Sequence, residues 1–486
     1  MAASQEPSSQ IDNGLVYCIW PEGEKVRSIV ISSIVTFLSP VSGTIYFPAI
    51  GQLSRELHVS QTTIHLTITV YLIAQGFAPL LTGSFSDANG RRPFLLSSLV
   101  VAVAANVGLT LQASVPALFT LRCLQSMGSS AVAIVAIAVV ADIVTRAERG
   151  KYMAYTSLGF TIGPVVGPVV GGVLTQFLGW RSVFVFLAIL AGVMIILILG
   201  FLPETCRAIV GNGSVPPPQW NRSILQLLQL DSFNKEQQPQ TVAISRRRPS
   251  FFDSIRIAGH KPTGLLILVI TLISCGSMSI FASIPALFGG YYGLNALEIG
   301  LCYIPFGVGG LAARWTIGIM VDRNFQRHSR ELGLDLPRNQ QAPEHLQDMP
   351  LEKARLQLTL PLVYASSAIV ILYGWLMQAR VHVSGPLVVL FFLGIVVTGT
   401  RNTLFSLIVD LHAGRPATAT AGVAFFRALS SAGVVAGIVP LLKAIGIGWT
   451  GVLIAAFWAV SSSALWGVYL YGHEWRRNAR QHNDSG

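Results

Sequence analysis

The chain has 486 residues, of which 52% are hydrophobic and only 11% charged, whereas a soluble domain carries roughly 25% charge. The mean hydropathy of +0.59 is likewise high for a soluble domain. Together these figures exclude a single soluble domain and a disordered chain. Five scattered cysteines without a Cys-x-x-Cys pair argue against a disulfide framework and a structural zinc site. A net charge of +11 would suit a nucleic-acid partner, so the position of the charges decides that question.

Apolar runs long enough to cross a membrane recur along the whole chain. A transmembrane helix needs about 20 mostly apolar residues. We predict twelve spans, at 28–50, 63–83, 94–112, 116–142, 150–176, 182–203, 263–288, 296–321, 356–378, 386–410, 418–442 and 449–472. The first run lacks a basic leader and a cleavage site, so it is expected to be a retained helix. The sequence therefore predicts an all-α polytopic membrane protein.

The distribution of Lys and Arg predicts the orientation of these helices. With the N-terminus inside, the cytoplasmic segments hold twenty-five basic residues and the outer loops hold only four. Both termini are therefore expected in the cytoplasm. The net positive charge of the chain is explained by the Lys and Arg residues of the cytoplasmic loops, so no nucleic-acid partner is predicted.

The twelve predicted helices divide into two sets of six around the longest polar stretch. We expect a cytoplasmic tail at 1–27, a six-helix bundle at 28–203, a linker at 204–262, a second bundle at 263–472 with a cytoplasmic insertion at 323–355, and a tail at 473–486. The linker contains three consecutive prolines and has little apolar content to pack. Gly-x-x-x-Asp closes the second helix of each half, and internal repeats of this kind are typical of secondary transporters.

A short basic turn joins the second and third helices. Gly83 and Gly90 permit a sharp backbone path, and Arg91 and Arg92 hold the turn in the cytoplasm. Asp87 is a carboxylate that could meet the positive N-terminal end of a helix. A plain topogenic loop is the alternative interpretation.

This turn resembles the signature loop of the major facilitator superfamily, which reads Gly-x-x-x-Asp-x-x-Gly-Arg-Arg/Lys. Segment 118–128, with its embedded Arg122, is similar to the fourth-helix motif of that superfamily, and segment 159–172 resembles its fifth-helix antiporter motif. The Pro-Glu-Thr at 203–205 matches the fungal drug:proton antiporter family with twelve spans.

Further segments are similar to the quinidine-resistance-like branch of that family, namely 42–49, 66–76, 409–412 and 417–421. Two positions depart from the pattern. Val423-Ala424 replaces an Asn-Asn pair that is usual in the eleventh helix, and Phe325 stands where the second glycine of the repeated loop would be.

The resemblance implies the major facilitator fold, with two pseudo-symmetric six-helix bundles around a central cavity. It also implies a monomeric secondary transporter of the plasma membrane, with the vacuolar membrane as an alternative. The implied function is proton-coupled efflux of small apolar or weakly acidic compounds, such as drugs, toxicants or secondary metabolites, by alternating access. A proton-coupled importer on the same fold and a channel are the alternatives. The expected partners are a small-molecule substrate, protons and membrane lipid.

The chain offers no pattern for an enzyme. A Gly-x-x-x-x-Gly-Lys-[Ser/Thr] phosphate loop is absent, and the nine histidines are scattered. No enzymatic activity, catalytic residue, cofactor or metal is therefore predicted.

Glycines recur every four residues in the fifth predicted helix, so they share one smooth face. Small residues on one face let another helix approach closely in lipid, and the two prolines among them can bend the helix. Tight packing and gating both remain open for this motif. Its residues are Gly159, Gly163, Pro164, Gly167, Pro168, Gly171 and Gly172.

Charges within the predicted spans are the sharpest indication of mechanism, because an intramembrane ionisable group is costly unless it serves a site. Four arginines lie there (Arg122, Arg314, Arg401 and Arg427), and no Asp or Glu lies at comparable depth. Capping by backbone carbonyls or snorkelling is the alternative, and it is preferred for Arg314. His65 is a candidate titrating group, although a structural role is the alternative. We therefore assign Arg122, Arg401, Arg427 and His65 to coupling or to the cavity.

Buried arginines without buried carboxylates predict an electropositive cavity, which favours neutral or anionic substrates over permanent cations. The resemblance points the other way, because related exporters are associated with cationic drugs. For gating, we expect Asp87 to dock near Thr418 and Thr420 at the start of the eleventh helix. Asp322 would dock at the start of the fifth helix, near Arg149 and Gly150.

Overall fold

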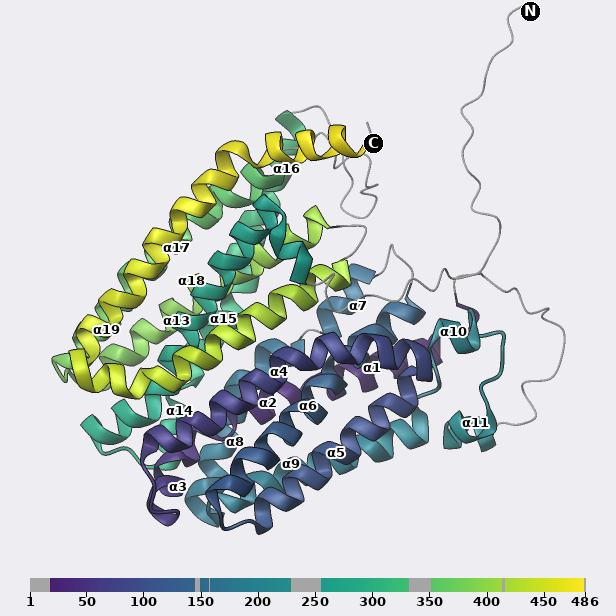
Figure 1. The fold of residues 1–486 in the computed structure, drawn as a ribbon, viewed down its shortest axis with the longest axis horizontal. Coiled ribbons are helices and arrows are strands. Elements are labelled where there is room, and N and C mark those ends of the chain that lie inside the picture. The colour runs from purple at the N-terminus through teal and green to yellow at the C-terminus, as the bar shows by residue number, and fades with distance from the viewer. Residues whose placement is uncertain are drawn as a thin grey trace, which may run out of the picture.

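The computed structural model describes residues 18–144, 149–156, 158–228, 255–331, 351–412 and 416–484. Within these ranges every regular element is helical, and the helices form two bundles that lie side by side (Figure 1). This architecture confirms the predicted all-α fold with two six-helix halves. All five cysteines are free thiols.

The N-terminal half contains six crossing segments. The first is assembled from α1 (Glu22–Thr36), α2 (Leu38–Thr44), the 3-10 helix η1 (Phe47–Ala49) and α3 (Ile50–Glu56). The other five are α4 (Gln61–Asn89), α5 (Arg91–Leu111), α6 (Val115–Ile143), α7 (Arg149–Thr156) followed by α8 (Leu158–Leu178), and α9 (Arg181–Phe201).

The C-terminal half begins at α13 (Lys261–Tyr292) after the 3-10 helix η3 (Ile257–Gly259). It continues with α14 (Ala296–Leu301), α15 (Ile304–Trp315), α16 (Ile317–Glu331), α17 (Leu351–Gln378), α18 (Ser384–Leu411) and α19 (Pro416–Asp484). In the described ranges, eleven helices are long and apolar enough to cross a membrane. The last of them reverses direction at Gly446, where φ is 77°, so it supplies the final two of the twelve predicted crossings.

Prolines break two of the predicted spans into shorter helices. Pro40 and Pro48 lack the N–H that would bond to the carbonyl four residues earlier, and the first span is accordingly divided into α1, α2, η1 and α3. Pro305 has the same effect between α14 and α15. The spans predicted at 28–50 and 296–321 are both present, but each is built from several shorter helices.

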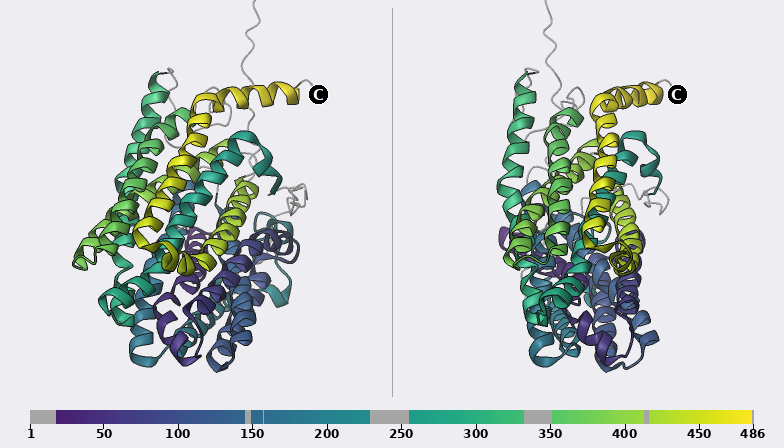
Figure 2. Two further views of the ribbon diagram at one scale, coloured as in Figure 1. Left: turned by 60° about the vertical axis from the view of Figure 1, so that its left-hand side comes forward. Right: turned by 90° about the vertical axis from the view of Figure 1, so that its left-hand side faces the viewer.

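The two halves contact each other towards one end of the molecule. Helix α8 packs against α14 and α15, and α4 packs against the first part of α19. Because the number of crossings is even, the start of α1 and the end of α19 lie at one end, and α14 lies at the opposite end, which the charge distribution predicts to be extracellular (Figure 1). Figure 2 shows the same two bundles from two other directions.

The first part of the predicted linker is folded onto the N-terminal half. Residues 204–228 include α10 (Arg207–Val210), the 3-10 helix η2 (Gln219–Asn221) and α11 (Ile224–Leu228), and α11 packs against α9. The backbone N–H of Ile19 donates to the Asn212 carbonyl at 3.1 Å. This packing differs from the expected linker with little to pack, and residues 229–254 lie outside the described ranges.

Candidate functional site

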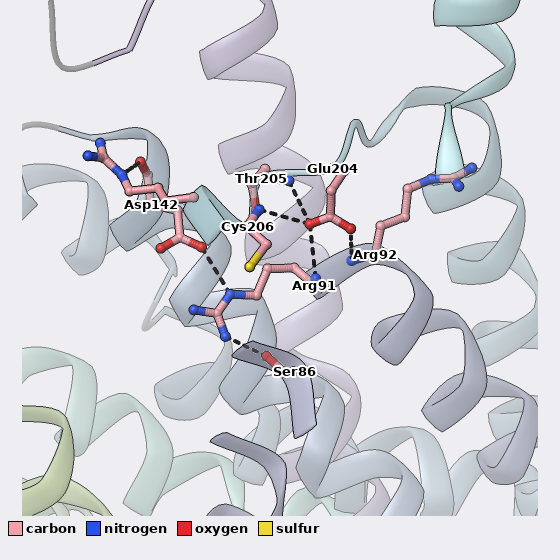
Figure 3. A network of polar contacts seen from close by, with 8 residues as sticks. Ser86, Arg91, Arg92, Asp142, Glu204, Thr205 and Cys206 are labelled. Atoms are coloured by element: carbon pink, nitrogen blue, oxygen red, sulfur yellow. Dashed lines mark hydrogen bonds and ion pairs between the residues drawn. The ribbon is translucent and has the colours of Figure 1, made fainter. Parts of the chain in front are cut away.

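A network of polar contacts surrounds the predicted basic turn at the end of the molecule that holds the termini (Figure 3). Helix α4 ends at Asn89 and α5 begins at Arg91, with Gly90 between them at φ 99°. A side chain at position 90 would place its Cβ about 2.5 Å from the Glu204 carboxylate. The turn therefore requires glycine both for its backbone angle and for the approach of Glu204.

Glu204 is the centre of this network, and it is 1% exposed. Its carboxylate accepts hydrogen bonds from the backbone N–H groups of Arg91 (2.9 Å) and Arg92 (3.3 Å) at the first turn of α5. It also accepts from the backbone N–H groups of Thr205 and Cys206 and from the side-chain amide of Asn221, at 2.8–2.9 Å. The carboxylate thus occupies the anion site that a helix N-terminus offers.

The side chain of Arg91 connects the turn to α6. Its Nε donates to Asp142 Oδ2 at 2.9 Å, and its Nη1 donates to Ser86 Oγ. The Nε of Arg207 donates to the Asp142 carbonyl, also at 2.9 Å. Buried Arg92 donates from Nη2 to the Leu199 carbonyl at the end of α9, at 3.2 Å. Helices α4, α5, α6 and α9 are therefore bound together at this end of the N-terminal half.

The sequence indicates where the turn lies, but it does not indicate which residues form hydrogen bonds with it. In the sequence, Glu204 stands out only as part of the Pro-Glu-Thr motif, and nothing local connects Asp142 to the turn. The side chains of Asp87 and Arg149 lie outside the described set, and the surroundings of Gly83 and Gly150 are likewise not described. The proposed docking of Asp87 near Thr418 and Thr420, and of Asp322 near Arg149, consequently stays a prediction.

Arg122 lies in the core of the N-terminal half with 0% exposure. Its guanidinium stands 4.4 Å from the ring centroid of Tyr46 and 4.6 Å from that of Tyr71. Its Nη1 donates to Gln125 Oε1 at 2.6 Å, whereas Nε and Nη2 have no hydrogen-bond partner in the part of the chain that the structure describes. A desolvated cation–π contact contributes about 2 kcal/mol, so the two rings offset part of the cost of burying the charge.

Hydrogen bonds extend this cluster across the bundle. The Gln125 amide donates to Asn106 Oδ1 at 2.6 Å. The Tyr46 hydroxyl is 3.3 Å from Thr67 Oγ1, and the Tyr71 hydroxyl is 3.2 Å from Ser129 Oγ. In the described part of the chain, no carboxylate forms an ion pair with Arg122. The cation is thus held by rings and neutral amides.

The other predicted cavity residues are distributed over both halves. Arg401 on α18 and Arg427 on α19 are half-buried and lie close enough to interact electrostatically. Arg427 also interacts with Cys275 on α13. His65 is buried in α4, and both of its ring nitrogens lack a hydrogen-bond partner among the described residues. The structure therefore groups Arg401 with Arg427 and leaves Arg122 in a separate cluster of the other half, while the implied central cavity stays a prediction.

The glycine face of α8 packs chiefly within the N-terminal half. A Cβ at Gly159 would lie 2.9 Å from Thr36 Oγ1, and one at Gly163 would lie 2.7 Å from Pro40. The same face continues through Gly167 against Thr44 and through Gly171 against the Ile45 carbonyl. Close approach of α8 to the first crossing therefore explains the four-residue glycine repeat.

Contact with the other half comes from the neighbouring face of α8. A Cβ at Gly172 would lie 2.6 Å from the Ala296 carbonyl and 3.2 Å from Gly300, and Gly300 in turn abuts the Pro168 carbonyl. Val165 lies directly against Gly307 of α15. Small residues on both sides thus bring the two halves into backbone contact at this end.

Two six-helix halves that contact each other at one end form the architecture of a secondary transporter. The model of the Major Facilitator Superfamily matches residues 32–438, and the chain belongs to that superfamily. It is a multi-pass membrane protein, and members of this family are typically not enzymes.

Curated fungal relatives match nearly the whole chain. "MFS-type transporter R5" of Phoma sp. is 40% identical, covering 99% of this chain and 91% of its own length. "MFS-type transporter clz19" of Cochliobolus lunatus is 41% identical, with coverage of 98% and 90%. "Citrate exporter 1" of Aspergillus niger is 32% identical, with coverage of 97% and 91%.

A solved structure shares the fold. The crystal structure of the human organic anion transporter MFSD10 matches with a TM-score of 0.57 at 17% identity, covering 92% of this chain and all of that chain. At this identity the likeness establishes the fold alone.

Proposed function

We propose that this transporter exports small organic anions or weak acids by proton-coupled alternating access, as a member of the fungal twelve-span drug:proton antiporter branch. The observation that carries the proposal is the charge of the buried polar groups. Arg122 is completely buried, and Arg401 lies within electrostatic range of Arg427. Among the described residues, none of the three forms an ion pair with a carboxylate.

The pair of arginines in the C-terminal half is the stronger part of this argument. Arg401 and Arg427 carry like charges that repel each other, and such repulsion is stronger inside a protein than in water. An anion bound between Arg401 and Arg427 would relieve that repulsion, whereas a permanent cation would add to it. Both side chains are half-buried rather than sealed, so they remain accessible to a ligand.

The name of one relative also supports the export of an organic anion. "Citrate exporter 1" is named for an organic anion and for export, and the present chain is 32% identical to it over 485 residues. This relative favours export over the import alternative and an acidic substrate over a cationic drug.

Alternating access would use the contact between the halves as one of its two gates. Helix α8 meets α14 and α15 at the predicted extracellular end. The conformation is therefore interpreted as closed to the outside and facing the cytoplasm. In the opposite state, Asp87 would dock at the start of α19 and close the cytoplasmic end, because a helix N-terminus attracts a carboxylate.

His65 is the proposed proton-binding group of the coupling step. It is buried in α4, the helix that packs on α19 of the other half. Both ring nitrogens are without hydrogen-bond partners within the described ranges, so a movement of α4 against α19 would give the imidazole access to protons or to a hydrogen-bond acceptor.

A transport assay in inside-out vesicles tests the proposal. The wild-type protein should accumulate citrate or an aromatic carboxylate better than a neutral analogue, and both better than a quaternary ammonium of similar size. Arg427→Gln and Arg401→Gln should each reduce anion accumulation at least tenfold. Arg181→Gln removes one exposed positive charge that pairs with Glu56 at 3.4 Å, and it should leave transport unchanged.

Two results would overturn the proposal. If the quaternary ammonium is moved best and the arginine variants keep that preference, the substrate class is wrong. If accumulation of every transported compound ignores a collapsed proton gradient, the coupling is wrong.

A further inference from the structure

Helix α16 presents a line of exposed side chains that changes from apolar to basic. The exposed positions Met320, Arg323, Arg327 and Arg330 recur at intervals of three or four residues, and this spacing places them on one helix face. We call Arg323, Arg327 and Arg330 the arginine face. Together with Gln326 and Glu331 they line a shallow groove that is open to the surroundings.

Contacts on the opposite side of α16 fix the direction of the arginine face. Phe325 is 8% exposed. Asn324 Nδ2 donates to the Ala354 carbonyl of α17 at 2.7 Å. The His328 ring nitrogen Nε2 lies 3.0 Å from Gln357 Oε1, also on α17. Because this side is held against α17, the exposed arginines are directed away from the bundle.

Two of the three arginines have no partner within the described residues. Arg327 Nε is 2.9 Å from Glu331 Oε1, but Arg323 and Arg330 form no hydrogen bond or ion pair there. The neighbouring carboxylate of Asp322 already has an interaction of its own. On the arginine face, the positive charges of Arg323 and Arg330 are therefore not neutralised by a carboxylate among the described residues. Arg327, which pairs with Glu331, lies between them, four residues after Arg323 and three before Arg330.

The position of this face relative to the membrane indicates what it binds. Trp315, Ile319 and Met320 come directly before it and are 70%, 44% and 51% exposed. Exposed apolar side chains of this size on a spanning helix face lipid chains, and tryptophan is typical of the membrane interface. The arginine face begins where these side chains end, at headgroup depth on the predicted cytoplasmic side, where anionic lipids are concentrated.

We propose that the arginine face binds the phosphate headgroup of an anionic phospholipid of the cytoplasmic leaflet, whose acyl chains lie along Ile319 and Met320. Arginine suits this role because its planar guanidinium can donate two hydrogen bonds to one phosphate. A free phosphate compound offers the same headgroup chemistry, but it makes no use of the apolar side chains next to the arginines.

Native mass spectrometry of the purified full-length protein in detergent tests the proposal. The probes are dioctanoyl phosphatidylinositol, dioctanoyl phosphatidylcholine and inositol phosphate. The wild-type protein should bind the anionic lipid more tightly than the zwitterionic lipid. The double variant Arg323→Gln, Arg330→Gln should weaken binding of the anionic lipid roughly thirtyfold, since each arginine near a membrane surface contributes on the order of 1 kcal/mol.

Matched variants separate a binding site from a general charge effect. Arg256→Gln with Lys261→Gln removes the same charge from two exposed residues before and at the start of α13, and this variant should bind like the wild type. Arg323→Lys with Arg330→Lys keeps the charge and should retain most of the binding. A double glutamine variant that elutes as a monodisperse peak and binds the anionic lipid like the wild type would overturn the proposal. Binding of inositol phosphate as tightly as the lipid would also overturn it, because the acyl chains would then contribute nothing.

Discussion

Replacement of Glu204 by glutamine should destabilise the cytoplasmic end of the N-terminal half. The carboxylate accepts five hydrogen bonds, four of them from backbone N–H groups. Glutamine has the same shape but no charge, and its amide nitrogen cannot accept from the donors that one carboxylate oxygen now serves. At least one buried donor is left without a partner.

The expected loss of folding stability in Glu204→Gln follows from these hydrogen bonds. Hydrogen bonds to a charged group contribute about 1.5–3 kcal/mol each, and an unsatisfied buried donor costs about 1–3 kcal/mol. Because the donors can partly rearrange around the amide, we expect a net destabilisation of about 2–4 kcal/mol. The first turn of α5 and the Arg91–Asp142 ion pair should loosen together, since Arg91 takes part in both.

Thermal unfolding of the purified protein in detergent, followed by tryptophan fluorescence, measures this effect. Glu204→Gln should lower the apparent unfolding temperature by several degrees. The control is Glu298→Gln, which removes an exposed carboxylate from the capping box at the start of α14 and should change stability by less than about 1 kcal/mol. Equal unfolding temperatures for wild type and Glu204→Gln would refute the central role of this carboxylate.

Three further predictions concern single positions. Gly172→Ala should displace α8 from α14 and reduce transport at equal expression, whereas Gly192→Ala, where a Cβ meets nothing within 4 Å, should transport like the wild type. Gly90→Ala should cost about 1–3 kcal/mol in unfolding experiments, because its φ of 99° strains any other residue, whereas Gly200→Ala should be neutral or slightly stabilising. Burial lowers the pKa of His412, just after α18, below its ordinary value of 6.5. The wild type should therefore lose stability as the pH falls below about 6.5, where the unfolded chain gains a proton that the folded chain resists. His412→Gln should flatten the unfolding temperature measured between pH 7 and pH 5, and an unchanged slope would contradict this account.

Much of the candidate site could be read in the sequence only as isolated residues. The sequence indicated a turn at Gly90 and an arginine at position 122 within a membrane span, because glycine and intramembrane arginine carry strong local signals. It did not indicate that Glu204 bonds to Arg91, 113 residues away, or that Tyr46 and Tyr71 enclose Arg122. Contacts between distant residues leave no periodic or local pattern in one sequence.

The sequence by itself determined the number and class of the helices. Runs of about 20 apolar residues can satisfy their backbone hydrogen bonds in lipid only as helices, so composition and length suffice to predict twelve crossings in two halves. The prolines at positions 40 and 305 were visible too, and a closer account of their missing N–H groups would have predicted the breaks in the first and eighth crossings.

Only the tertiary structure decided what each helix face contacts. The glycine repeat of α8 could equally have served the partner half, but most of it packs on α2, and Gly172 alone of the motif's glycines meets α14. Likewise, Arg401 and Arg427 became neighbours only through the packing of α18 on α19. The physical reason is that lipid is as apolar as the helix surfaces, so hydrophobicity places a helix in the membrane without specifying its partner. That choice rests on the fit of small residues against particular backbones and on the pairing of a few polar groups, which become defined only when all the helices are assembled.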